Sequence, residues 1–183
     1  MERRWLAVFA VAAVLACAVC AEGSHIAVEP SAVVRLEPPE GSSEGVRYVV
    51  SVELPESLAG ATVDYARLVF GAEVVSVSVA GPLMVEVYGV TTGWSAVSVG
   101  WEAPWEVPGG DFDARSHAAH VGAASEDVLV SVDVTGIVQG WVDGESENHG
   151  LLVLTPSGSG HTIVGVSETQ APVVEIWTTA GAR

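Results

Sequence analysis

The sequence contains no lysine, and its seven basic residues, all arginine, are outnumbered by 23 acidic residues. The formal net charge is −16 at pH 7. Proteins bind nucleic acids and anionic membranes largely by neutralising phosphate groups with lysine and arginine side chains. A chain this acidic is repelled by both surfaces. The composition therefore predicts no nucleic-acid partner and no electrostatic attachment to a membrane.

Cysteine is also scarce, because the chain has only Cys17 and Cys20, both close to the N-terminus. They lie in or beside a leader-like segment in which two arginines precede an apolar run over residues 5–16. Small residues before Glu22 suit a secretory cleavage site. The apolar run is too short to span a bilayer. We therefore predict a signal peptide over residues 1–21 and a secreted, extracellular or cell-surface protein.

A second interpretation of the same segment takes residues 14–17 as a lipobox, so that Cys17 carries a lipid that tethers the protein to a membrane. If cleavage instead occurs before Glu22, the mature chain, residues 22–183, has no cysteine and no disulfide bond. A chain of this length can bury enough apolar surface in one domain to be stable without cross-links. We therefore expect a single domain.

Long helical periodicity is the third feature that the sequence lacks. Short β-branched segments with alternating polarity are separated by turns at roughly ten-residue intervals. This pattern predicts an all-β fold, an antiparallel β-sandwich or jelly roll. The longest irregular stretch covers residues 104–125. The expected strands cover residues 26–28, 33–36, 47–54, 66–70, 75–79, 83–88, 130–134, 151–154, 162–167 and 173–178.

The most informative segment covers residues 131–154, which reads as a strand, one short helix, an acidic turn and a second strand. The helix is expected near residues 136–142. Ile137, Val138 and Trp141 share one face of such a helix, because neighbours on a helix face are three or four residues apart. The pattern therefore predicts that the helix packs onto the core through Trp141.

This strand–helix–strand unit, with the Asn148-His149-Gly150-Leu151 turn, resembles the DNRLRE domain family, which is also described as a family of carbohydrate-binding modules. Residues 47–55, which end in a Leu-Pro step, and residues 83–101, which contain two tryptophans, extend the resemblance over nearly the whole mature chain. The resemblance implies a secreted β-sandwich without catalytic activity of its own.

Tryptophan is the residue type that we expect to contact a sugar, because its ring face complements pyranose C–H groups. Trp101, Trp141 and Trp177 lie on periodic elements and are expected in the core. Trp94 precedes a strand and is expected to be half-buried. Trp105 lies in a proline- and glycine-rich loop without periodicity. We therefore predict that the Trp105 ring is exposed and binds a ligand.

Polar side chains next to Trp105 complete the predicted ligand site. Glu106, Asp111 and Asp113 follow in the same loop, and Trp94 precedes it. The ligand-binding residues predicted from the sequence are therefore Trp105, Glu106, Asp111, Asp113 and Trp94.

Two pairs of carboxylates have the chemistry that calcium prefers, because this cation takes six to eight oxygen ligands in irregular geometry. One pair is Asp111 with Asp113, and the other is Asp143 with Glu145. Neither follows the spacing of an EF-hand loop. Solvated acidic loops explain both pairs equally well, so calcium is one of two interpretations.

A signature of catalysis is absent, since the sequence contains no G-x-S-x-G nucleophile motif. No sequence pattern predicts a pair of carboxylates that could flank a glycosidic bond, as glycoside hydrolysis requires. We expect that the protein is not an enzyme. Two functions remain: a non-catalytic exported module that binds polysaccharide at or outside the cell surface, or a structural protein that self-associates in an extracellular layer or filament.

Overall fold

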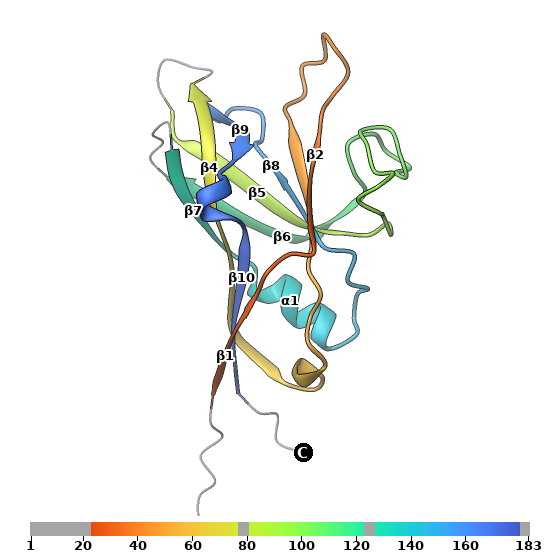
Figure 1. Ribbon diagram of the computed structural model, residues 1–183, viewed down its shortest axis with the longest axis vertical. Coiled ribbons are helices and arrows are strands. Elements are labelled where there is room, and N and C mark those ends of the chain that lie inside the picture. The colour runs from red at the N-terminus through yellow and green to blue at the C-terminus, as the bar shows by residue number, and fades with distance from the viewer. Residues whose placement is uncertain (1–22, 77–80, 123–126, 180–183) are drawn as a thin grey trace, which may run out of the picture.

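The computed structural model describes residues 23–76, 81–122 and 127–179, in which two antiparallel sheets are accompanied by one short α-helix (Figure 1). The predicted all-β sandwich is confirmed. The predicted signal peptide, residues 1–21, and the alternative lipidation site at Cys17 lie outside the described residues. In the described ranges no helix is both long and apolar enough to cross a membrane.

Two five-stranded sheets form the sandwich. The first sheet has the strand order β1–β10–β4–β7, and β9 pairs with the far end of β4. Its strands are β1 (Ser24–Val28), β4 (Thr62–Ser76), β7 (Asp127–Asp133), β9 (His161–Val166) and β10 (Val173–Thr179). The second sheet has the order β2–β3–β8–β5–β6. Its strands are β2 (Ala32–Leu36), β3 (Arg47–Ser51), β5 (Leu83–Val90), β6 (Phe112–Gly122) and β8 (Leu151–Leu154).

The main core lies between the two sheets and follows the alternation in the sequence. Leu68 on β4, Val85 on β5 and Ile176 on β10 are completely buried there. Successive side chains of a strand point to opposite faces, so alternate residues of each strand reach this core. Burial of apolar surface at about 25 cal/mol per Å² is the main favourable contribution to such a fold.

A second apolar cluster covers the outer face of the second sheet. This outer cluster consists of Leu36, Val49, Val90, Trp101, Trp105 and Leu152. The two tryptophans belong to the connection between β5 and β6, which lies beside β2 in Figure 1. The central strands β3 and β8 are therefore buried on both faces. For this reason Val49 is buried as fully as its neighbours Tyr48 and Val50, instead of alternating with them.

The helix α1 spans Thr135–Val142, as the sequence predicts, and its residues Ile137, Val138 and Trp141 are buried. It also completes the hydrogen bonding of β4. Strand β7 ends opposite Arg67, so the start of β4 has no neighbouring strand on that side. The α1 side chains of Gln139 and Thr135 take its place by accepting the N–H groups of Val63 (2.6 Å) and Ala66 (2.9 Å). Buried backbone donors need such partners.

Two predictions of where strands begin and end are wrong. Residues 104–125 were expected to be irregular, but residues 112–122 form β6 at the edge of the second sheet. This segment is rich in alanine and histidine and lacks the β-branched alternation of an inner strand, so only its pairing with β5 identifies it. The strands expected at residues 66–70 and 75–79 are one continuous strand, β4, as far as Ser76, and residues 77–80 lie outside the described residues.

Candidate functional site

The ring of Trp105 is buried, with only 7% of the residue exposed. Its Nε1 donates a hydrogen bond to the backbone oxygen of Gly100 at 2.7 Å. The prediction of an exposed, sugar-stacking ring at this position is wrong. The physical reason is that the two-sided burial of β3 and β8 requires a cover for the outer face of the second sheet, and Trp105 supplies part of that cover.

Of two other tryptophans, one has the burial that the sequence predicts and one does not. Trp94 is half-buried as predicted, and its Nε1 donates to the backbone oxygen of His149 at 2.7 Å. Trp177 was expected in the core but is only half-buried, on the outer face of the first sheet. His25 stacks on it at 4.5 Å and Tyr65 lies at 5.3 Å. These neighbours cover its ring faces, so Trp177 offers no free platform for a sugar.

The carboxylate of Asp111 organises the loop that carries Trp105. It accepts the N–H groups of Glu106 (2.9 Å) and Val107 (2.8 Å) and the hydroxyl of Thr92 (2.7 Å). Burial of the carboxylate works against ionisation and is the largest single influence, but the three hydrogen bonds together lower the pKa of Asp111. Asp111 and Glu106 line a separate hollow with Thr92. Asp111 therefore acts within the loop as a structural acceptor.

Neither predicted calcium pair belongs to a larger cluster of metal-ligating side chains among the described residues. Both carboxylate oxygens of Asp113 bind the guanidinium of Arg115 at 3.1 Å, and these hydrogen bonds lower the pKa of Asp113. Asp143 accepts a hydrogen bond from Gln139 at 2.9 Å. Across the described parts of the chain, no three His, Cys, Asp or Glu side chains gather where they could hold a metal ion.

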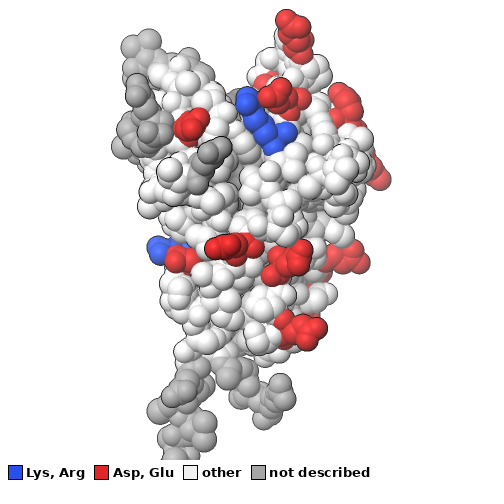
Figure 2. Space-filling view, in the orientation of Figure 1, with Lys and Arg blue, Asp and Glu red and all other residues white. Residues whose placement is uncertain are grey.

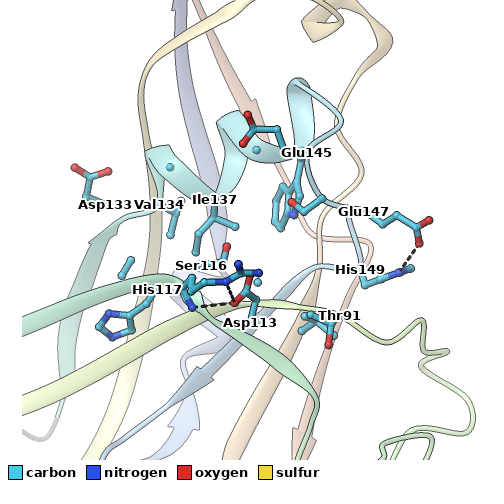
Figure 3. A pocket seen from close by; sticks show the side chains of 18 residues that line it. Thr91, Asp113, Ser116, His117, Asp133, Val134, Ile137, Glu145, Glu147 and His149 are labelled. Atoms are coloured by element: carbon cyan, nitrogen blue, oxygen red, sulfur yellow. Dashed lines mark hydrogen bonds and ion pairs between the residues drawn. The ribbon is translucent and has the colours of Figure 1, made fainter.

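A groove of about 660 Å³ lies between α1 and β6 (Figure 3). It opens where β6 bulges. Tyr88 and Gly89 are consecutive on β5, but three residues of β6 separate their partners, which are His117 and Asp113. The bulge bends the edge strand at this point. Asp113 and Glu145 both line this groove, although they belong to two separate acidic pairs in the sequence.

The groove has apolar and polar surfaces. Ile137 and Trp141 of α1 form an apolar floor beneath the groove, where they are largely buried, with 3% and 8% of each residue exposed. Thr91, Ser116 and His149 supply hydrogen-bonding groups. This combination of an apolar surface with a few convergent polar groups is typical of ligand pockets.

Glycines keep the groove open. A Cβ atom at Gly89 would lie 3.0 Å from Oγ of Ser116, whereas one at Gly136 would meet no atom within 4 Å. Gly136 and Gly140 both line the groove and are four residues apart on α1, so they share a helix face. That spacing was visible in the sequence and could have identified this face of the helix as the wall of a site.

Comparison with models of known protein families found no match, and comparison with curated proteins found no similar sequence.

Replacing Trp105 with alanine should lower the free energy of unfolding by about 3 kcal/mol, because it leaves a cavity in the outer cluster. Urea denaturation measures the change. Val97→Ala is the matched control in the same connection, since Val97 is 96% exposed and its truncation should change stability by less than about 0.5 kcal/mol. An unchanged midpoint for Trp105→Ala would show that the ring is not a packing residue.

Proposed function

We propose that this protein is a non-catalytic, exported module that binds polysaccharide in the groove between α1 and β6. The observation that carries the proposal is the groove itself, in which Thr91, Ser116 and His149 supply hydrogen-bonding groups above an apolar floor of the largely buried Ile137 and Trp141. A pyranose ring has the complementary character, with apolar C–H faces and a polar rim of hydroxyl groups. The groove volume also falls within the range of roughly 300–1,000 Å³ that ligand pockets occupy.

Asp113 does not suit the role of a general acid in this groove. A carboxylic acid that cleaves a glycosidic bond as a general acid needs a raised pKa, so that it is protonated near neutral pH. Hydrogen bonding to Arg115 lowers the pKa of Asp113 instead. The leader-like residues 1–21 and the resemblance to the DNRLRE domain family support export and a binding role.

Filling the groove should abolish binding. The test is Gly136→Leu, because Gly136 lines the groove and a Cβ atom at this position would meet no atom within 4 Å. Isothermal titration of residues 22–183 with neutral oligosaccharides of cellulose, xylan and chitin should show at least about a tenfold loss of affinity for any sugar that the wild type binds.

Gly136→Ala is the control for the blocking variant. It adds one methyl group, should retain binding, and should stabilise α1 by roughly 0.5–1 kcal/mol because alanine loses less backbone entropy than glycine. Unchanged binding by Gly136→Leu would exclude the groove as the sugar site.

Self-association is a second candidate function, and one observation favours it. Strand β6 is 11 residues long and forms an edge of the second sheet. From Ala114 to Gly122 it contains no acidic residue, although the whole chain carries a formal charge of −16. A sheet edge without acidic residues can pair with a second copy through its backbone groups. Multi-angle light scattering of the wild-type protein distinguishes a monomer from such an assembly.

A further inference from the structure

We propose that the groove selects glycans that carry free amino groups over the same glycans in N-acetylated form and over anionic glycans. This selectivity rests on the proposed function, since it concerns the same groove. It follows from the imbalance of charge around a cavity that already offers apolar and hydrogen-bonding surfaces to a sugar ring.

Carboxylates outnumber cations along the groove. Asp113, Asp133, Glu145 and Glu147 all line it, and Arg115 is the single lysine or arginine among the lining residues that the structure describes. The two lining histidines, His117 and His149, have carboxylate neighbours of their own, Glu86 at 3.9 Å and Glu147 at 3.0 Å.

Arg115 does not offset the remaining charges. Its Nε and Nη2 both bind the Asp113 carboxylate at 3.1 Å, so these two opposite charges form a neutral pair. A bidentate pair of this kind holds the guanidinium in one orientation. Three carboxylates, on Asp133, Glu145 and Glu147, are therefore left without a compensating arginine in the groove. One oxygen of Asp133 accepts hydrogen bonds from the N–H (3.0 Å) and the hydroxyl (2.6 Å) of Thr135, which leaves its negative charge in place.

These three carboxylates are spread along the groove and are open to solvent. In Figure 3 Asp133 lies at one end, Glu147 lies at the other, and Glu145 lies on the α1 side between them. The Glu147 side chain is 87% exposed. Glu145 is exposed, and its backbone N–H donates to the oxygen of Gly140 at 2.9 Å, whereas its carboxylate has no hydrogen bond or ion pair with any described residue. A polymer with an amino group on successive sugar rings could therefore meet more than one carboxylate.

The charge of the ligand decides whether the groove carboxylates attract it or repel it. A protonated amine forms a charge-assisted hydrogen bond with a carboxylate, which is about twice as strong as a neutral hydrogen bond. An N-acetyl group carries no charge, and a uronate or sulfate is repelled. Acidic side chains are also spread over the face of the molecule shown in Figure 2, so the test must separate the groove from the general field of the protein.

The experiment titrates the protein with a chitosan hexamer and with the fully N-acetylated hexamer of the same length, at about pH 6, where sugar amino groups are mostly protonated and glutamate side chains remain ionised. At about 20 mM salt we expect the amino form to bind about tenfold more tightly. At about 500 mM salt the difference should fall below about threefold, because exposed charges are then screened. A hexuronate oligomer should bind less tightly than either form.

Two double variants separate the groove from the rest of the surface. Glu145→Gln with Glu147→Gln should remove most of the preference for the amino form, measured as the ratio of the affinities for the two hexamers. Glu29→Gln with Glu40→Gln changes the total charge equally at exposed positions outside the groove, and should keep the preference. Equal effects of the two double variants would overturn the proposal.

The remaining outcomes are also distinct. Equal affinity for the two hexamers would overturn the selectivity but leave the proposed function standing. Absence of binding to every oligosaccharide would overturn both. Spermidine, a polyamine without a sugar ring, should bind at least about tenfold more weakly than the amino hexamer. If spermidine bound equally tightly, the groove would recognise amines in general, and the sugar-specific proposal would fail.

Discussion

Trp141→Ala should lower the free energy of unfolding by about 3–5 kcal/mol. The ring is the largest side chain that α1 places in the main core, where it lies with Ile137 and Val138. Alanine would leave a cavity and would also weaken the attachment of α1 to β4. Denaturant unfolding followed by circular dichroism gives the change directly.

Trp177→Ala is the matched control for Trp141→Ala, because the same atoms are removed from a half-buried position on the outer face of the first sheet. Its expected cost is about 1–2 kcal/mol, from lost contact with His25 and Tyr65. A cost below about 1 kcal/mol for Trp141→Ala, or a larger cost for Trp177→Ala, would contradict the assignment of Trp141 to the main core.

Gly150→Ala should lower the free energy of unfolding by at least about 3 kcal/mol, because two penalties act at one residue. The backbone of Gly150 has a φ of +89°, a conformation that a side chain disfavours. A Cβ atom here would also overlap the backbone carbonyl oxygen of Val50 on β3. That oxygen belongs to a central strand of the second sheet and cannot move aside without disturbing its pairing.

The turn around Gly150 also anchors its neighbours. Gly150 donates its N–H to Oδ1 of Asn148 at 3.0 Å, and its backbone oxygen accepts the N–H of Val90 at 3.0 Å. The Nδ2 of Asn148 donates to the backbone oxygen of Val52 at 2.7 Å. A shift of Gly150 would therefore disturb the end of β5 as well as β3.

Gly144→Ala separates the two penalties at Gly150. Gly144 has a similar φ, +71°, but a Cβ atom there would meet no atom within 4 Å. Its substitution should cost only the conformational penalty, about 1–2 kcal/mol. Equal losses of stability for Gly144→Ala and Gly150→Ala, measured by urea denaturation, would show that the approach of Gly150 to β3 has no energetic consequence.

The sequence by itself determined the features that depend on local spacing. Alternation of apolar residues predicted most strands and the sandwich, since a strand turns successive side chains to opposite faces. The helix at Thr135–Val142 and the burial of Trp141 were predicted from apolar residues three and four positions apart. These features can be predicted from the sequence because each depends only on residues that are a few positions apart.

Only the tertiary structure decided which surfaces face solvent. The loop sequence around Trp105 contains no period, so its position over the outer face of β3 and β8 depends on residues far away in the chain. Likewise β6 becomes a strand through its pairing with β5, since its own alanines and histidines have weak strand preference.

The groove is the clearest case of a feature set by tertiary contacts. Asp113 reaches it from the bulge of β6, while Glu145 and Glu147 reach it from the turn that follows α1. The sequence placed Asp113 beside Asp111, but their carboxylates bind different partners, the Arg115 guanidinium and the backbone of the Trp105 loop. Residues near in sequence were separated and distant ones were joined, because strand pairing and the packing of α1 fix directions that local spacing does not contain.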